Sequence, residues 1–333
     1  MKTVRWGILG CGDVTEVKSG PGLSRAKNSK LVAVMRRNGE LAKAYAERNN
    51  VPRWYDDADK LINDPDVDIV YIATRPDSHK DYVLKCAAAG KAALVEKPVA
   101  RTYEEALSMV EACKAARTPL WVAFYRRAMP LFAKVKELVD SGAIGKVRYV
   151  SVHHQEITPA EGFESLPASW RYVPEIGGGG VFVDIGSHAF DFLDYLLGPI
   201  REVRGIAANQ AGLYAAEDMV TACFSFANGV QGAGTWSFVA YENFERTWVV
   251  GDKGELSFSF YAPNPIVLKT ADGTQTFDIG FPEHVHQPLI QTIVDEMNGE
   301  GACPSTGESG IRASWVMDQV LADYRAVKGI RFP

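Results

Sequence analysis

Two acidic residues and a histidine lie on one face of a predicted helix. Asp184 and His188 are four residues apart and Asp191 follows near the same stripe, so their side chains share one helical face. A carboxylate beside an imidazole orients the ring and supports its protonated form, which suits a group that passes a proton. The alternative is an aspartate that caps the helix and a structural histidine. Gly186 lies between them, and because a glycine costs a helix about 1 kcal/mol, we expect another backbone or a ligand to approach there.

A lysine directly follows a buried apolar run. Ala92–Val95 has the pattern of a strand, and Glu96-Lys97-Pro98 comes after it. In open α/β sheets, ligands bind beyond the carboxyl ends of the strands. An ammonium group there orients a hydroxyl or carbonyl oxygen and stabilises the negative charge that develops on it. The alternative is a surface lysine, the ordinary place for this residue type. Pro98 fixes the chain direction and is a candidate for a cis peptide bond.

A glycine-rich turn follows the first apolar run, Val4–Leu9, and has the pattern Gly10-x-Gly12-x-x-Thr15. In a dinucleotide-binding loop the first glycine permits the tight turn and the second lets the backbone approach a pyrophosphate. The N–H groups that open the next helix bind that pyrophosphate. An ordinary glycine turn fits the same pattern. Thr15 replaces a third small residue, which predicts a slightly wider spacing of helix and strand. The residues expected at the cofactor are Gly10, Gly12, Asp13 and Val14.

The end of the second apolar run bears on which dinucleotide fits. Proteins that bind NAD place an acidic residue there, on the ribose 2′-hydroxyl. This chain has Arg36 and Arg37 instead, and arginine forks complement a 2′-phosphate. A solvated strand end is the alternative explanation. The position of the pair favours NADP(H), with NAD(H) as the second choice.

Short apolar runs alternate with helical patterns through residues 1–124, which predicts βαβ units around a parallel sheet. The runs lack a clean alternation and suit strands covered on both faces. After residue 124 strand-like runs follow one another, with hairpin signals at Asn228-Gly229 and Asp272-Gly273. We therefore expect an α/β protein with a Rossmann doubly wound domain over 1–124. An α/β domain with an open, mostly antiparallel sheet, for substrate binding and oligomerisation, is expected over 125–333.

The composition is that of a globular protein. The chain has 333 residues, 47% of them apolar, and a net charge of −5, so bulk charge attracts neither nucleic acid nor a membrane surface. Five cysteines without CxxC spacing favour free thiols in a reducing compartment, and no metal site is expected. No apolar run approaches the ~18 residues of a membrane span, and the first run is too short for a signal peptide. These features predict a soluble, cytoplasmic protein.

Together these motifs resemble those of the Gfo/Idh/MocA family, the group of glucose–fructose oxidoreductase and inositol dehydrogenase. The combination of Glu96-Lys97-Pro98 with Asp184 and His188 is specific, whereas the glycine loop alone is not. The matching segments, in order from residue 3 to about 198, are Gly10-x-Gly12, 71–79, 89–91, 96–98, Trp170-Arg171, 178–180 and 184–191.

The resemblance implies a role for several residues. The catalytic residues would be Lys97, Asp184 and His188. Residues near the cofactor, the first three on its nicotinamide side, would be Thr74, Pro76, His79, Glu96 and Lys97. Further candidates for the substrate cleft are Arg126, Trp170 and Arg171, of which Trp170-Arg171 also fits a packing role. The open sheet of the second domain would join subunits in a homodimer or homotetramer.

The expected activity is reversible hydride transfer between NADP(H) and a hydroxyl or carbonyl carbon of a sugar, cyclitol or related polyol. His188 would pass the proton, Asp184 would orient it, and Lys97 would polarise the reacting oxygen; whether Lys97 or His188 is the acid–base stays open. One alternative is a redox-assisted NAD-dependent glycosidase of the same fold, which the absence of an acidic residue at position 36 disfavours. The other is a non-enzymatic dinucleotide-binding sensor, which would not need the three catalytic residues.

Overall fold

The computed structural model describes residues 1–157 and 169–332. The chain folds as two compact units. The first comprises Met1–Ala100, Glu104–Met129 and Pro282–Ile311, and the second comprises Arg101–Tyr103, Pro130–Phe281 and Arg312–Pro333. The main difference from the linear division 1–124 and 125–333 is the segment 282–311. It belongs to the first unit because helix α9 (Gln287–Met297) places apolar side chains in that unit's core.

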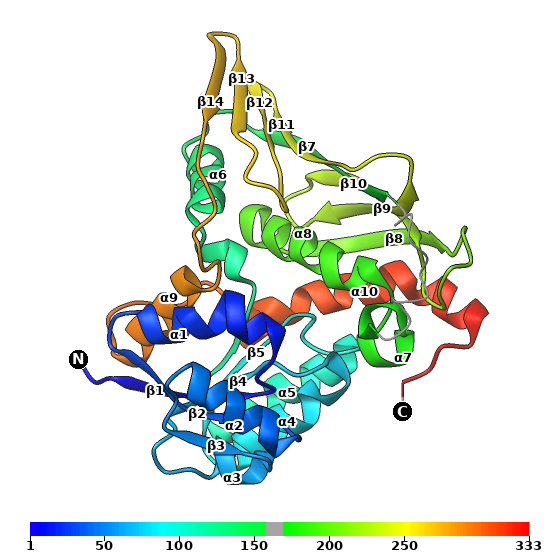
Figure 1. Cartoon of the computed structure of the whole chain (residues 1–333). Coiled ribbons are helices and arrows are strands. Elements are labelled where there is room, and N and C mark those ends of the chain that lie inside the picture. Colours follow the sequence, from blue (N-terminus) through cyan, green and yellow to red (C-terminus); the bar gives the residue numbers. More distant parts are fainter. Residues whose placement is uncertain (158–168, 333) are drawn as a thin grey trace. The chain divides into compact units, whose positions relative to one another are not determined.

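The first unit holds a six-stranded parallel sheet in the order β3-β2-β1-β4-β5-β6 (Figure 1). Its strands are β1 (Val4–Leu9), β2 (Ser29–Met35), β3 (Arg53–Tyr55), β4 (Ile69–Ile72), β5 (Ala92–Val95) and β6 (Leu120–Val122). The strand order reverses direction between β1 and β4, which is the place where doubly wound sheets bind ligands. The predicted Rossmann architecture is confirmed. The prediction missed only β3 in this sheet, whose three residues carry too short a pattern.

Helices cover both faces of this sheet because its strands are apolar on both sides. On one face Trp6 and Ile8 share a core with Leu289 of α9. On the other, Gly7 leaves room for Leu61, whose Cδ2 would lie 2.8 Å from a Cβ there. The helices are α1 (Gly20–Arg25), α2 (Gly39–Arg48), α3 (Ala58–Ile62), α4 (His79–Ala88), α5 (Tyr103–Ala116) and α9, with a π-helical turn η1 (Thr15–Ser19) and 3-10 turns η2 (Pro76–Ser78) and η3 (Tyr125–Ala128).

The second unit holds an eight-stranded sheet in the order β14-β13-β12-β11-β7-β10-β9-β8 (Figure 1). Every neighbouring pair is antiparallel except β7 and β10. The expected hairpin turns are present, with positive φ at Gly229 and Gly273. The strands are β7 (Val147–Ile157), β8 (Ile200–Ala208), β9 (Met219–Phe226), β10 (Gln231–Ala240), β11 (Phe244–Gly251), β12 (Gly254–Phe258), β13 (Ile266–Thr270) and β14 (Gly273–Phe277).

Alternating burial along β9 and β10 gives this sheet one covered and one open face. On the covered face Trp236 packs against Phe182 and Phe190 of helix α8, with ring centroids 5.1 and 5.3 Å apart. The aromatic side chain of Trp236 therefore packs in the core. The helices of this unit are α6 (Pro130–Asp140), α7 (Pro174–Gly177) and α8 (Val181–Leu197), and most of α10 (Gly307–Lys328), with a 3-10 turn η5 (Trp170–Tyr172).

The described cysteines are all free thiols, four of them buried, as the sequence predicted. Within residues 1–157 and 169–332, no helix is long and apolar enough to cross a membrane.

A buried glutamate holds the start of α8. The backbone N–H of Gly180 donates to Oε1 of Glu217 over 2.7 Å, and Glu217 is fully buried. Gly180 is required here because a Cβ would lie 2.5 Å from the Glu217 carbonyl oxygen. Burial raises the pKa of Glu217 to about 7, against the smaller opposing effect of the Gly180 hydrogen bond.

We predict that the variant Glu217→Gln gains stability relative to the native protein as pH rises. The folded-state pKa is raised from 4.5 to about 7, so the protonated carboxyl stabilises the fold fully below about pH 4.5, and that contribution is lost as pH rises through about 7. A tenfold difference in proton affinity between the folded and unfolded chain corresponds to about 1.4 kcal/mol. Urea unfolding at several pH values measures the effect, with the exposed Glu137→Gln as control. Parallel pH curves for native protein and E217Q would show that Glu217 is not responsible.

Candidate functional site

The glycine loop follows β1 at the carboxyl edge of the parallel sheet. Gly10 has φ +89°, and a Cβ on it would lie 2.8 Å from Cγ2 of Thr74. The first bonds of the following helix run from the N–H groups of Thr15 and Glu16 to the Gly12 carbonyl, 2.9 and 3.0 Å. The N–H groups of Asp13 and Val14 precede these bonds, the position where helix donors take an outside acceptor. Among the described residues, a Cβ on Gly12 would have only the Gly10 oxygen within 4.0 Å, so the backbone is approachable there.

Thr15 turns its side chain back into this loop. Its Oγ1 accepts from the N–H of Gly12 over 2.9 Å and contacts the Gly12 carbonyl at 2.7 Å. Tyr45 donates from its hydroxyl to the Thr15 carbonyl over 2.9 Å. The threonine thus fixes the loop from inside, a role that its position in the motif does not reveal.

Arg36 and Arg37 directly follow β2 and are both exposed. The end of β2 contacts the glycine loop, since the N–H groups of Gly10 and Cys11 both donate to the Met35 carbonyl. In the described part of the chain, no ion pair engages either guanidinium. The two exposed cations therefore follow directly on the residue that binds the loop.

The segment after β4 is hydrogen-bonded to the residues that follow β5. Thr74 is half-buried and accepts from Ser78 over 2.8 Å, while Pro76 is buried at the start of η2. His79 is fully buried, with Nε2 3.0 Å from the Thr74 carbonyl and Nδ1 3.1 Å from the carbonyls of Pro98 and Val99. Burial lowers the pKa of His79. The ring thus joins the ends of β4 and β5, and its influence on a ligand would pass through Thr74 and Pro98.

Lys97 is half-buried directly beyond β5, and the peptide bond to Pro98 is cis, as the sequence suggested. Glu96 before it is buried and accepts three hydrogen bonds. Tyr71 donates to Oε1, His286 donates to Oε1 over 2.9 Å, and the backbone N–H of Lys97 donates to Oε2 over 3.1 Å. Burial alone would raise the pKa of Glu96, but the hydrogen bond and charge of His286, the charge of Lys97 and the hydrogen bond from Tyr71 lower it to about 2. Glu96 is therefore a carboxylate at neutral pH.

The arginines after β6 differ in what they contact. Arg126 is buried, and its guanidinium lies 5.1 Å from the ring centre of Tyr125. Arg127 is also buried and donates to the Pro304 carbonyl and to Oγ of Ser309, over 2.7 and 2.8 Å. Arg127 therefore anchors the 304–309 segment.

In the second unit, Asp184 and His188 lie in the first two turns of α8 and are buried. Tyr261 donates from its hydroxyl to the Ile185 carbonyl over 2.6 Å, which fixes this stretch of helix. A Cβ on Gly186 would lie 2.8 Å from Phe182 Cε2 and 3.2 Å from Met317 Cε. The expectation of a backbone or ligand approaching Gly186 was therefore wrong, because two side chains fill the space.

Arg171 and Asp184 are brought together although thirteen residues separate them. Nε of Arg171 donates to Oδ2 of Asp184 over 2.7 Å, and the guanidinium lies 4.6 Å from the ring centre of Trp170. Trp170 in turn packs on Gly177, where a Cβ would lie 3.3 Å from its Cε3. The Trp170-Arg171 pair thus packs, and its arginine contacts a candidate catalytic residue.

Sequence reasoning missed three residues that hold the candidate site residues of each unit in place. Tyr71 and His286 bind Glu96, and Glu217 binds the start of α8. His286 lies 190 positions from its partner, and a lone histidine before a helix carries no signal of such pairing. Glu217 in Glu217-Asp218 resembles a solvated turn. Each residue acquires its role only through long-range packing.

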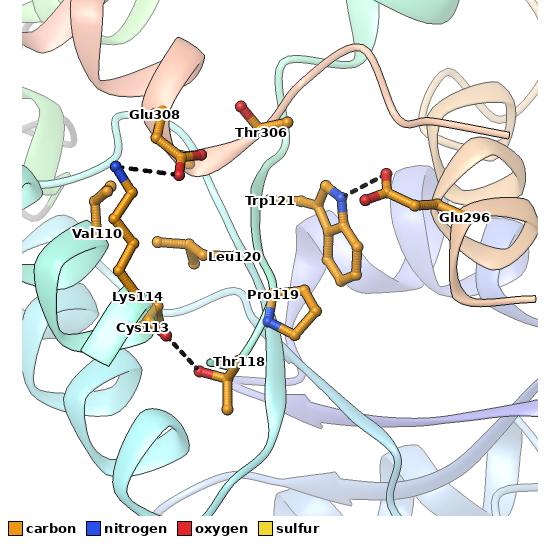
Figure 2. A pocket seen from close by; sticks show the side chains of 11 residues that line it. Val110, Cys113, Lys114, Thr118, Pro119, Leu120, Trp121, Glu296, Thr306 and Glu308 are labelled. Carbon is orange, nitrogen blue, oxygen red and sulfur yellow. Dashed lines mark hydrogen bonds and ion pairs between the residues drawn. The ribbon is translucent and has the colours of Figure 1, made fainter. Parts of the chain in front are cut away.

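A cavity of about 150 Å³ lies elsewhere in the first unit (Figure 2). Thr118, Pro119 and Leu120 line it at the amino end of β6, whereas ligands of doubly wound sheets bind beyond the carboxyl ends. Its charged groups are already paired, with Lys114 3.4 Å from Glu308 and Trp121 donating to Glu296 over 3.1 Å (Figure 2). We therefore assign the candidate site to the opposite edge of this sheet.

The two domains match two models of one family. Residues 4–124 match the model described as "Oxidoreductase family, NAD-binding Rossmann fold", and residues 132–257 match the "GFO/IDH/MocA C-terminal domain". The glycine loop suits such a dinucleotide, since it offers the N–H groups of Asp13 and Val14 at a helix start and open space beside Gly12.

Relatives cover almost the whole chain. Oxidoreductase P35 of Formosa agariphila is 36% identical, over 95% of this chain and 97% of its own. The 1,5-anhydro-D-fructose reductase of Ensifer adhaerens is 28% identical, over 97% and 96%. Among solved structures, a levoglucosan dehydrogenase in complex with NADH and levoglucosan has a TM-score of 0.85 at 24% identity and covers 98% of both chains. This last likeness supports the fold.

The two glycines of the loop should respond differently to alanine. Gly10→Ala should lower the unfolding midpoint, because φ +89° and a 2.8 Å contact with Thr74 both oppose a side chain. Gly12→Ala should fold normally but weaken NADPH binding by about tenfold or more, because its methyl group occupies the pyrophosphate approach. Calorimetry and NADPH fluorescence measure these effects, with Gly301→Ala as an open-space control. Native affinity in G12A would exclude the loop as the pyrophosphate site.

Proposed function

The chain belongs to the Gfo/Idh/MocA family of oxidoreductases, and we propose that it transfers a hydride between NADP(H) and a hydroxyl or carbonyl carbon of a sugar, cyclitol or related polyol. Its class is that of an NAD-binding dehydrogenase or reductase of sugars. The observation that supports the proposal most strongly is the position of the candidate catalytic residues within each unit. Lys97 follows β5 at the carboxyl edge that holds the glycine loop, and Asp184 and His188 share one face of α8.

We propose that Lys97, Asp184 and His188 act on one substrate oxygen. When bound, the nicotinamide supplies or accepts the hydride. The Lys97 ammonium holds and polarises the reacting oxygen, and the His188 imidazole passes the proton while Asp184 orients it. Arg171, bonded to Asp184, keeps that carboxylate in place. Lys97 and His188 both remain candidates for the acid–base.

We propose NADP(H) as the preferred cofactor and NAD(H) as the alternative. Arg36 and Arg37 are exposed at the end of β2, beside the loop that would hold the pyrophosphate. A guanidinium fork at this position matches a 2′-phosphate, while NAD-specific proteins use an acidic residue there. The cofactor would further contact Thr74 and Pro76, and the buried His79 and Glu96 would act on it through their neighbours.

We propose two further features of the working enzyme. Arg126, Trp170 and Arg171 would border the substrate. The open face of the eight-stranded sheet would join copies of the chain in a homodimer or homotetramer. That face carries apolar side chains without cover, including Ile206 and Tyr149, 78% and 49% exposed, and exposed apolar patches mark interaction surfaces.

Loss of either proposed catalytic side chain should abolish turnover and spare cofactor binding. Lys97→Met and His188→Ala should each lower kcat by about a hundredfold or more, since positioned acid–base groups contribute at least that much. NADPH affinity should change little. A panel of carbohydrates and dicarbonyls, followed at the reduced-nicotinamide absorbance, measures turnover, and Lys80→Met on α4 is the control. Full activity in both variants would refute the assignment.

The same panel separates the alternatives. Cleavage of a glycoside with no net change in nicotinamide absorbance, from protein that retains tightly bound NAD(H), would identify a redox-assisted glycosidase. NADPH binding without turnover of any substrate would indicate a sensor. Net oxidation of polyols or reduction of carbonyls supports the proposal.

Cofactor choice should depend on the arginine pair. The variant Arg36→Ala/Arg37→Ala should raise the KM for NADPH by roughly tenfold or more, the worth of a charge-assisted hydrogen bond, and leave the KM for NADH nearly unchanged. Steady-state kinetics with both cofactors measure this, with the exposed Lys43→Ala on α2 as control. An equal rise for both cofactors, or a native preference for NADH, would contradict the proposal.

A further inference from the structure

A buried cluster joins four segments of the first unit beneath Lys97. Tyr71 comes from β4, Glu96 from the end of β5, Tyr125 from η3, and His286 from the residue before α9. His286 is 2% exposed, its Nε2 donates to Glu96 over 2.9 Å, and its ring centre lies 4.3 Å from that of Tyr125. The segment 282–311 therefore brings a side chain directly to the proposed catalytic edge.

The hydrogen bonds of the cluster orient the Glu96 carboxylate. Glu96 is a carboxylate and accepts only, so Nε2 of His286 carries the proton of the bond between them. Nδ1 of His286 is buried and has no hydrogen-bond partner in residues 1–157 and 169–332, so the ring makes its hydrogen bond there through Nε2 alone. Glu96 is also tied to the backbone N–H of Lys97. His286 thus orients the carboxylate that anchors the start of the lysine residue.

We propose that His286 is a positioning residue for the reaction, which it serves by fixing Glu96 so that Glu96 holds the main chain of Lys97 where the lysine acts. The inference rests on the proposed function, because it takes Lys97 to be catalytic. Without the His286 donor, Glu96 would retain Tyr71 and one backbone N–H in a buried setting. Burial favours the protonated carboxyl, and a protonated Glu96 binds the Lys97 N–H weakly.

Four titratable side chains face Glu96 or lie next to it: Lys97, Tyr71, His79 and His286. Lys97 on its own segment lowers the pKa of Glu96. From β4, Tyr71 faces it with a pKa raised far above neutrality, and Tyr45 of α2 lies beyond Tyr71. From α4, His79 faces it with a pKa lowered by burial. From the start of α9, His286 donates to it. A change of His286 therefore acts first on Glu96.

The test compares His286→Phe with His286→Gln. Phenylalanine keeps a ring against Tyr125 and removes the donor, whereas glutamine supplies an amide N–H near the position of Nε2. We expect H286F to lower kcat by about tenfold or more, and to add an acid limb to its pH profile, with activity falling as pH falls through the raised Glu96 pKa. H286Q should restore most of kcat. Glu96→Gln should be slow without the acid limb.

Two further measurements separate positioning from general damage. NADPH affinity, from the fluorescence of the bound cofactor, should stay near native in H286F. The unfolding midpoint of H286F, compared with that of the native protein at the same pH, should improve as pH falls. The reason is that a raised folded-state pKa of Glu96 stabilises the fold at low pH. His284→Phe is the matched control, since His284 contacts the Val17 carbonyl and Glu283 outside the cluster.

The outcomes are distinct. Native turnover with an unaltered kcat and pH profile in H286F would overturn the role of His286 and leave the proposed function standing. A kcat loss that is equal at every pH, is accompanied by a lower midpoint and is not rescued by H286Q would show a merely structural histidine, and would also overturn it. Absence of turnover in the native protein would count against the proposed function itself.

Discussion

The carboxylate of Glu96 is buried at the carboxyl edge of the parallel sheet, where Tyr71, His286 and the backbone of Lys97 donate to it. A buried charge is costly unless hydrogen bonds replace its water, so these donors permit an anion here and set its orientation. Strands β4 and β5 and the segment before α9 are thereby joined at one point. In the proposed mechanism, the direction in which Lys97 leaves β5 depends on this arrangement.

In the second unit, hydrogen bonds from other segments likewise hold the first turns of α8. Glu217 accepts the N–H of Gly180 at the helix start, Arg171 pairs with Asp184, and Tyr261 holds the Ile185 carbonyl. The helix stretch with Asp184 and His188 is therefore fixed from three sides within its own unit. Reactive groups whose positions are set before a ligand binds need little reorganisation during the reaction. Each unit therefore fixes the side chains that we propose it contributes to the reaction.

Local pattern was enough to predict much of the fold. Fully buried parallel strands such as Val4–Leu9 and Ala92–Val95 appear in the sequence as unbroken apolar runs, and the structure gives both with the same bounds. The short β3 was missed, because three residues carry no clear period. The placement of 282–311 with the first unit was also missed, since it follows from core packing across the chain.

The same limit applies to the candidate site. Spacing along one helix placed Asp184 and His188 on a common face, and a strand end marked Lys97. The partners that hold them, Arg171, Glu217 and His286, come from elsewhere in the sequence and have no motif of their own. Thr15 shows the limit at short range, because the glycine pattern predicts neither its bonds to Gly12 nor the π-helical turn that begins with it.

Lys97 and His188 belong to different compact units, and the proposed chemistry requires them to serve one reacting oxygen. A crystal structure of the protein with NADP⁺ and a polyol taken from the turnover panel tests this most directly. We expect Nζ of Lys97 and a ring nitrogen of His188 each at about 3 Å from the same hydroxyl, beside the nicotinamide C4. Side chains that open onto separate crevices would contradict this mechanism.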